Sequence, residues 1–368
     1  MRAPYSRILA TSLAFSAATG MTAAGAAPSA PAACAAPGSA HPESADGAAC
    51  RLADELEKAF VIPDQGVAYA KALRAHVAAG RYAGRTADEA ARIMTADLQE
   101  VAADGHLRVE LEATRQLPGR APPGQKPTPL LEQGGWIAPG IAFLRINAFA
   151  PDDAQTAQVA RFMADHAEAK AIVFDIRTHG GGGLAQMDVI FPWLFAEETR
   201  LVTMAMRRSV EEEHGTPFGD GPTLRKLAGT PQESVREHWA VPNADPRLRD
   251  AKVYLLTSRR TGSAAEHFAL AMKHTGRATL VGSNTAGANH FGGGIPLGGG
   301  FGAFMPVGRT YDQVTGKDWE GDGVAPDVAV EPAQALEWVL KDLGIDASRA
   351  AELAASHAPT LPMERRKA

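Results

Sequence analysis

The stretch Ala171-Ile-Val-Phe-Asp-Ile-Arg-Thr-His-Gly-Gly-Gly-Gly183 decides the fold class of this 368-residue chain. It begins with a short apolar run, typical of a strand that is buried on both faces, and a glycine run follows. An apolar segment of helical length comes next, at about residues 185–195. A strand, a glycine turn and a helix in this order predict a parallel or mixed sheet with helices on its faces.

The same alternation continues through the second half of the chain. Strands are expected at residues 141–147, 252–257, 278–281 and 328–330, and helices at residues 153–169 and 264–273. Residues 207–248 are polar and lack a clean period, which predicts a mobile insertion near the functional site.

The first half predicts a small antiparallel helical bundle, because apolar residues recur at helical spacing over residues 52–103. Its third helix has a capping box in Thr86 and Glu89. An alternating strand is expected at residues 106–112, and a proline-rich loop at residues 113–133.

Composition places the chain among ordinary globular proteins, with 45% hydrophobic and 21% charged residues. A formal net charge of −5 offers no basic surface for nucleic acid or for anionic membranes. The start resembles an export signal, since Arg2 and Arg7 precede an apolar stretch and a small-residue cleavage site. No other segment is long enough to span a membrane, so we expect an exported, periplasmic or secreted protein without an integral span once the signal is removed.

Five segments are expected along the chain. These are a signal peptide at 1–26, a low-complexity tether at 27–50, the helical bundle at 51–106, an αβ catalytic core at 107–343 and a C-terminal tail at 344–368. The two cysteines, Cys34 and Cys50, could form one disulfide in an oxidising compartment or remain free, and a lipidated Cys34 is the alternative. Paired CxxC or HExxH spacing is absent from the sequence, so we expect no metal and no cofactor.

Three segments have the residue types of a hydrolase site. The glycine run, Gly180 to Gly183, could present backbone N–H groups to an anion or oxyanion, or form a flexible turn. Ser263 lies between small residues after a strand and before a helix, where it could be a nucleophile or a helix cap. Glu320, in a glycine-rich turn, could orient a histidine or be a solvated loop residue.

Five segments, taken in order, resemble the tail-specific or C-terminal-processing serine peptidases. They begin at Phe143, Val173, Leu256, Val281 and Glu320. Within that family the chain looks most similar to the branch of interphotoreceptor retinoid-binding protein, which shares its catalytic arrangement with tricorn protease. The resemblance covers about residues 50–332. It implies a crotonase-like or ClpP-like α/β core of stacked β-β-α units behind the helical bundle. Only about 25 residues separate the expected strand at 106–112 from that at 141–147, too few for the PDZ-like domain of many relatives.

The resemblance also implies roles for individual residues. Ser263 matches the nucleophile, and the N–H groups of Ala264 and of the glycine run, Gly180, Gly181 and Gly182, match the oxyanion hole. Ala288 stands where the lysine-dyad branch has its base, so a Ser/Lys dyad is not expected. His106 and Glu320 match the base and its orienting acid in the tricorn-like branch, although Gly105 replaces the serine that precedes the histidine there.

Several alternatives stay open at this stage. His290, in a glycine-rich segment, could contact substrate or replace His106 as base, and Arg145 could bind a peptide carboxylate. His179 and His267 are interpreted as packing or surface residues. We expect a serine peptidase acting on peptides or unfolded segments, with a non-catalytic hydrophobic-ligand-binding protein and an esterase-like acyl hydrolase as the competing functions. The sequence leaves the oligomeric state open.

Overall fold

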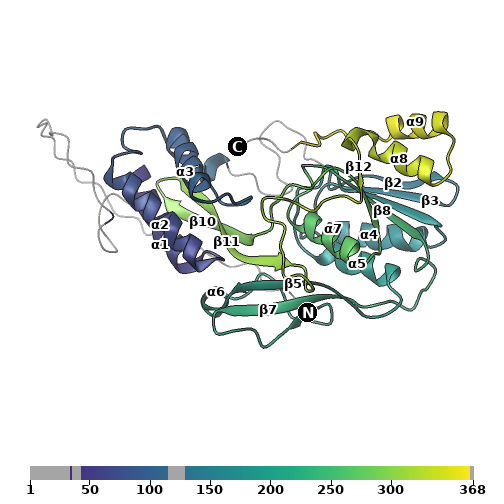
Figure 1. Cartoon of the computed structure of the whole chain (residues 1–368), viewed down its shortest axis with the longest axis horizontal. Helices are drawn as coiled ribbons and strands as arrows, with labels where there is room; N and C mark the ends of the chain where they lie inside the picture. The colour runs from purple at the N-terminus through teal and green to yellow at the C-terminus, as the bar shows by residue number, and fades with distance from the viewer. Residues whose placement is uncertain (1–33, 35–42, 115–128, 365–368) are drawn as a thin grey trace, which may run out of the picture.

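The computed structural model describes residues 34, 43–114 and 129–364, so the expected signal peptide and most of the tether lie outside the described residues. Two six-stranded sheets, with helices packed on them, make up this described part of the chain (Figure 1). The expected α/β class is confirmed. The expectation of a single sheet is wrong, because the strands after the glycine loop divide between two sheets.

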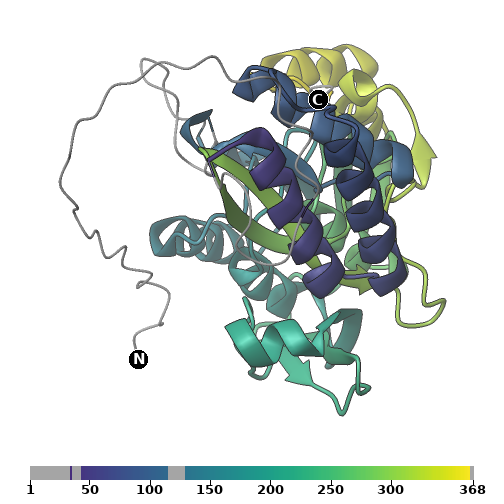
Figure 2. The same cartoon turned by 90° about the vertical axis from the view of Figure 1, so that its left-hand side faces the viewer.

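The first sheet is antiparallel and carries the helical bundle. Its strand order is β1 (Arg108–Leu111), β11 (Phe301–Tyr311), β5 (Thr199–Arg207), β7 (Glu233–Ala240) and β6 (Leu224–Lys226), and β10 (Phe291–Gly298) also pairs with β11. A single 3-10 turn, Glu112–Thr114, follows β1. Three helices cover one end of this sheet, namely α1 (Ala45–Ala59), α2 (Pro63–Ala78) and α3 (Ala87–Val101) (Figure 2).

The bundle is held to the sheet by apolar packing and by a disulfide. Leu52, Leu56 and Leu98 belong to the same buried cluster as Phe301 and Met305 of β11. The capping box of α3 is confirmed. Cys34 and Cys50 form a disulfide, which fixes Cys34 to α1 beside this cluster.

The second sheet is parallel except at one edge. Its order is β12 (Val328–Ala329), β9 (Thr279–Gly282), β8 (Lys252–Thr257), β4 (Ala171–Asp175), β3 (Ile141–Ile146) and β2 (Leu131–Ala138), and β2 runs antiparallel to β3. Both faces are buried, as the apolar run of β4 predicts, since Ile172 and Phe174 belong to one cluster and Val173 to another.

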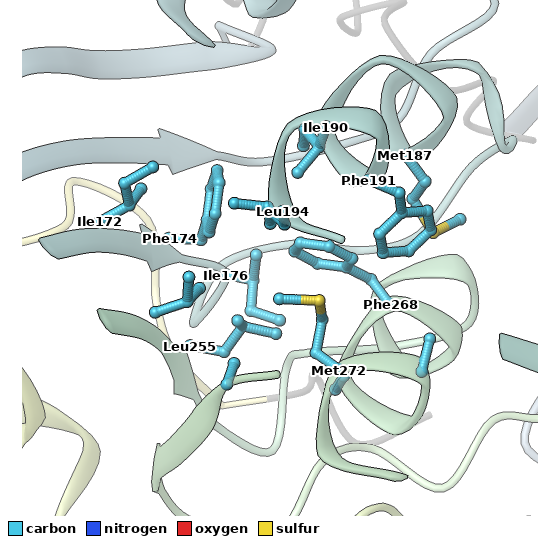
Figure 3. Close-up of a cluster of buried hydrophobic side chains, with 14 of the residues drawn as sticks. Ile172, Phe174, Ile176, Met187, Ile190, Phe191, Leu194, Leu255, Phe268 and Met272 are labelled. Atoms are coloured by element: carbon cyan, nitrogen blue, oxygen red, sulfur yellow. The ribbon is translucent and has the colours of Figure 1, made fainter. Parts of the chain in front are cut away.

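One face packs against α4 (Asp153–Asp165), α5 (Ala185–Leu194) and α7 (Ala264–His274). In this cluster Phe174 and Phe191 lie around Phe268 of α7 (Figure 3). A 3-10 turn, Pro332–Gln334, precedes α8 (Ala335–Asp342) and α9 (Ala347–Ser356), which cover the other face. The expected C-terminal tail therefore contains a packed helix.

The polar insertion is part of the first sheet rather than an irregular segment. It contains α6 (Arg208–His214), β6 and β7, and β7 pairs with β5 along its length. Its polar sequence fits this arrangement, because several side chains form ion pairs, such as Arg236 with Glu211 at 2.5 Å. The interval between β1 and β2 is too short for a PDZ-like domain, as expected.

Candidate active site

Ser263 occupies the turn between β8 and α7 in a strained conformation. Its φ of 57° and ψ of −122° make it the one non-glycine residue with positive φ in the described part of the chain. Such a conformation costs on the order of 1–3 kcal/mol and persists only where its surroundings enforce it. Among the residues that the structure describes, none accepts a hydrogen bond from the Ser263 hydroxyl, whose oxygen takes part in a capping box with Glu266. A strained serine at a helix N-terminus, with a hydroxyl proton that has no acceptor, is typical of a nucleophile.

The buried carboxylate of Glu266 holds this turn in place. Its Oε2 accepts hydrogen bonds from the N–H groups of Ser263, at 2.8 Å, and Ala288, at 2.9 Å. Its Oε1 accepts from the N–H of Gly287 and the hydroxyl of Thr285. Burial raises the pKa of Glu266, and these four donors act against that rise. Sequence reasoning missed this residue, although a serine followed three positions later by glutamate at a helix start is a recognisable signal.

The glycine loop packs directly against Ser263. A Cβ on Gly181 would lie 2.7 Å from the Cβ of Ser263, and Gly181 has a φ of +107°, so only glycine fits there. The backbone N–H groups of Gly180 and Gly181, which were expected to form part of the oxyanion hole, already have acceptors. The N–H of Gly180 donates to the carbonyl of Asn147, and that of Gly181 donates to Nδ1 of His179, both at 3.0 Å. Gly180 and Gly181 are therefore not oxyanion donors in this conformation.

Two N–H groups beside Ser263 remain uncommitted. Among the residues that the structure describes, none accepts a hydrogen bond from the N–H of Gly182 or of Ala264. Ala264 is the first residue of α7, where the helix dipole adds positive potential. An anion that develops at Ser263 would find its donors here.

His179 is a buried residue that links the glycine loop to the turn before Ser263 through hydrogen bonds. Its ring is buried against Phe149, and its carbonyl accepts a hydrogen bond from the N–H of Gly262, next to the serine. Burial lowers the pKa of His179 to about 3, so the ring stays neutral and Nδ1 can accept from Gly181. The packing interpretation of His179 holds and the surface interpretation is wrong.

The segment that carries His106 packs directly against the loop beside the serine. A Cβ on Gly105 would lie 2.7 Å from the Cα of Ala288 and 2.7 Å from the carbonyl oxygen of Gly287. Any larger residue at position 105 would collide with this backbone, which explains the glycine there. The small side chain of Ala288 and the absence of one at Gly105 therefore let the histidine segment approach.

An acid–histidine–acid cluster lies beside this contact. Nδ1 of His290 is 2.6 Å from Oδ2 of Asp104 and 3.8 Å from Oε2 of Glu320. Glu320 also accepts hydrogen bonds from the backbone N–H of Gly105, at 2.5 Å, and of Asn289, at 2.7 Å. The second nitrogen of His290, Nε2, is buried without a hydrogen-bond partner in the described part. Asp104 was not among the site residues expected from the sequence.

Asp104 and His290 stabilise each other's charges, whereas Asp104 disfavours a charge on Glu320. Burial disfavours the ionised forms, but the hydrogen bond and opposite charge outweigh it, so the pKa of His290 is raised and that of Asp104 is lowered. Burial and the neighbouring Asp104 raise the pKa of Glu320. Ligand atoms of these three residues lie within 4.8 Å of one another, but the 2.6 Å hydrogen bond between His290 and Asp104 already uses two of them. We therefore treat the cluster as a proton-binding group.

His106 itself follows Asp104 closely. Its backbone N–H donates to Oδ1 of Asp104 at 2.8 Å, and its ring stacks on Phe304 of β11 with the centroids 5.0 Å apart. Ser263 is bonded to neither His106 nor His290. Catalytic hydrogen bonds are often looser before substrate binds, so this geometry retains both histidines as candidate bases.

Arg145 lies in the core rather than facing a substrate. Its guanidinium is almost fully buried and pairs with Asp175 at 2.8 Å. Its remaining donors contact Gln133 and the carbonyls of His357 and Ala358. The expectation that Arg145 binds a peptide carboxylate is therefore wrong, because a buried guanidinium needs internal partners.

The end of the chain reaches the turn that carries the serine. The carbonyl of Met363 accepts hydrogen bonds from the hydroxyl of Ser258, at 2.7 Å, and from the N–H of Arg260, at 3.1 Å. Ser258 also lies 2.5 Å from the carbonyl of Arg177, just before the glycine loop. Met363 thus holds the turn that precedes Ser263, and through Ser258 it is linked to the segment that precedes the glycine loop.

Comparison with known families assigns the chain. A model of peptidase family S41 matches residues 140–330, which is more than half of the 368 residues. The chain belongs to peptidase family S41. The protein is therefore a serine peptidase, and the family resemblance inferred from the five motifs is confirmed. The match includes Ser263, Glu320 and the glycine loop, and it excludes the bundle and His106.

Two solved structures have a similar fold. A putative peptidase from Parabacteroides merdae has a TM-score of 0.53 and 18% identity, over 86% of this chain and 97% of its own. The photosystem II D1 C-terminal processing protease has a TM-score of 0.50 and 16% identity, over 83% of this chain and 99% of its own.

Proposed function

We propose that this protein is an exported serine peptidase that hydrolyses peptides or unfolded protein segments through an acyl-enzyme on Ser263. The observation that carries the proposal is the strained Ser263, which packs against Gly181 of the glycine loop and is followed by Ala264. The N–H groups of Ala264 and of Gly182, the next residue of that loop, have no acceptor among the described residues. A nucleophile and two oxyanion donors at one helix N-terminus are the minimum that acyl transfer requires.

The chemistry proceeds in two halves. A neutral imidazole removes the hydroxyl proton as Oγ of Ser263 attacks the scissile carbonyl carbon, and the N–H groups of Gly182 and Ala264 hold the oxyanion. The imidazolium then gives its proton to the leaving amine as the C–N bond breaks. Water, deprotonated by the same imidazole, attacks the ester and releases the acid and the free serine. Each oxyanion donor contributes roughly 3 kcal/mol to the barrier reduction.

We assign the base to His106, with Glu320 as the acid that orients it. The contact between Gly105 and Ala288 supports this choice, because it brings the histidine segment against the loop that Glu266 ties to Ser263. Glu320 bonds to the N–H of Gly105, immediately before the histidine.

His290 is the second candidate for the base. Its Nδ1 is held by Asp104 at 2.6 Å while Nε2 is left without a partner among the described residues, which is how a triad histidine is oriented. Against it, the His290 ring packs edge-on to Phe60 of the bundle, with the centroids 6.1 Å apart.

A fluorophosphonate serine probe tests the nucleophile. We expect the wild-type protein to be labelled and Ser263→Ala to remain unlabelled. Ser348→Ala is the control, because Ser348 is exposed on α9, its hydroxyl bonds to the neighbouring Asp346, and its loss should leave Ser263 reactive. Labelling that persists in Ser263→Ala, or wild-type protein that is never labelled, contradicts the proposal.

The identity of the general base is tested by making the same substitution, histidine to glutamine, at each of the two candidate positions. We expect His106→Gln to lower kcat for a fluorogenic peptide by roughly 10³-fold or more, and His290→Gln to retain the larger share of activity. If His290→Gln instead loses more of its kcat than His106→Gln, His290 is the general base. Labelling without peptide hydrolysis, but with hydrolysis of acyl esters, would favour the esterase alternative, and ligand binding without labelling would favour the non-catalytic binder.

Export rests on the sequence of residues 1–26 alone. No helix in the described part is long and apolar enough to cross a membrane. N-terminal sequencing of the mature protein from a fractionated bacterial host tests this proposal. We expect a start near Ala27 in the periplasmic or secreted fraction, and an intact Met1 in the cytoplasm would contradict it.

A further inference from the structure

Two buried histidines and a half-buried aspartate outside the proposed catalytic machinery form a continuous chain of hydrogen bonds. Nε2 of His238 is 2.9 Å from Oδ1 of Asp188, and Nδ1 of His238 is 2.8 Å from Nε2 of His267. His238 is completely buried and His267 is 3% exposed, whereas the Asp188 side chain is 32% exposed. We call this chain of hydrogen bonds the Asp188–His238–His267 relay.

The relay has a defined direction at its Asp188 end. A carboxylate accepts only, so Nε2 of His238 carries the proton that Asp188 receives. One further proton lies between Nδ1 of His238 and Nε2 of His267 and joins the two rings. Burial, together with His238, holds the pKa of His267 well below its ordinary value. Both hydrogen bonds of the relay are thus satisfied at once.

The two ends of the relay lie on the two helices that border the site. Asp188 is the fourth residue of α5, the helix that follows the glycine loop. His267 is the fourth residue of α7, and its N–H donates to the carbonyl of Ser263 at 3.0 Å. His238 is the sixth residue of β7, in the first sheet. The relay therefore connects the first turn of each helix through a strand of the other sheet.

We propose that Asp188, His238 and His267 are positioning residues that set the spacing between the oxyanion donors of Gly182 and Ala264. The proposal rests on the proposed peptidase function of Ser263. Gly182 lies just before α5, and Ala264 begins α7, so fixing the first turns of both helices fixes both N–H groups.

The spacing matters because an oxyanion must lie about 2.7–3.1 Å from both donors at once. A misplacement of about 1 Å by a residue remote from the chemistry can lower the rate on the order of a hundredfold. The loss is expected in kcat and not in KM, because the oxyanion forms only in the transition state.

The test is His238→Phe, which keeps an aromatic ring beside Phe191 and removes both hydrogen bonds. We expect kcat for a fluorogenic peptide, and the rate of fluorophosphonate labelling, to fall by roughly ten- to a hundredfold with KM unchanged. Asp188→Asn retains an acceptor for His238 and should keep nearly full activity, whereas Asp188→Leu should behave like His238→Phe.

His274→Phe is the matched control. His274 also lies on α7 and also pairs with an acid, Asp312, at 3.1 Å, but at the C-terminal end of the helix. It should keep kcat within about twofold even where its melting temperature falls as far as that of His238→Phe. Equal losses of kcat in the two variants, or unchanged kcat in His238→Phe, overturn the proposal.

A failure of the proposed function is recognised separately. If wild-type Ser263 is never labelled, amide hydrogen exchange decides the positioning role. We then expect exchange in the first turns of both α5 and α7 to quicken together in His238→Phe and to stay unchanged in His274→Phe. Unchanged exchange in His238→Phe, or quickening confined to α7, overturns the proposal.

Discussion

The carboxylate of Glu266 binds the backbone N–H of Ser263 and the backbone N–H of Ala288 through one oxygen, at 2.8 and 2.9 Å. This single side chain joins the turn of the proposed nucleophile to the loop against which the histidine segment packs. The strain of Ser263 is thereby balanced by a buried side chain that accepts four hydrogen bonds.

Glu266→Gln should destabilise the protein by roughly 2–4 kcal/mol, because an amide nitrogen replaces one acceptor oxygen and faces buried N–H groups. Urea denaturation measures the loss. Glu89→Gln is the matched control, since Glu89 also accepts a hydrogen bond from the N-cap N–H of its helix but is exposed. Its cost should stay near 1 kcal/mol, and equal costs in the two variants would contradict the prediction.

Ser263→Gly should make the protein more stable than Ser263→Ala, by about 1 kcal/mol. Both variants lose the hydroxyl, but glycine adopts a φ of 57° without strain whereas alanine does not. Thermal and urea unfolding of the pair measure the difference. A glycine variant no more stable than the alanine variant would show that the turn is unstrained.

Gly105→Ser should destabilise the protein by roughly 1–3 kcal/mol and lower the rate of fluorophosphonate labelling. The new Cβ would fall 2.7–2.8 Å from backbone and side-chain atoms of Gly287 and Ala288, which are held by Glu266. Gly219→Ser, at a position with open space, is the control. If both serine variants unfold at wild-type urea concentrations, the close approach does not constrain residue 105.

The pair of Asp104 and His290 should give stability that depends on pH. The pKa of His290 is raised in the folded state, so its contribution is complete below 6.5 and is lost as pH rises through the raised value. The pKa of Asp104 is lowered, so its contribution is complete above 3.8 and is lost as pH falls through the lowered value.

The free energy of unfolding of wild type minus that of His290→Asn should therefore be largest between about pH 4 and 6.5 and should shrink at higher pH. Chemical denaturation across this range measures it, and taking the difference cancels most of the separate contribution of Glu320. A difference that grows above pH 6.5 would contradict a charged His290.

His179 should make the protein sensitive to acid. Its folded pKa of about 3 lies below its ordinary value of 6.5, so stability is complete above pH 6.5 and falls by roughly 1.4 kcal/mol per pH unit on acidification toward pH 3. His179→Asn keeps an acceptor for Gly181 without a titrating ring. Its stability should fall less between pH 6.5 and 4.5, and a parallel fall in both proteins would show that His179 is not the group responsible.

Local patterns predicted the elements of the site well. The apolar run before the glycines, and the strand, turn and helix around Ser263, depend on neighbours in sequence, and both were placed to within a few residues. Arg145 was placed wrongly because an arginine in a strand carries no sign of whether its partner is a substrate or a buried Asp175.

Contacts between residues far apart in the sequence could not be predicted from sequence patterns. His290 and Asp104 are 186 residues apart, and His238 and Asp188 are 50 apart, so no spacing along the chain relates them. The division into two sheets was missed for the same reason, since it depends on β5 pairing with β11 and β7. Tertiary packing decides such contacts.

The hydrogen bonds from Met363 to Ser258 and Arg260 have a consequence for biosynthesis. Met363 follows every strand of the two sheets in the sequence, so these bonds cannot form until both sheets and α9 have been synthesised. The turn that carries Ser263 thus receives this support only after the segments that surround it. A peptidase assembled in this order would acquire a finished nucleophile only after its two sheets have had time to fold.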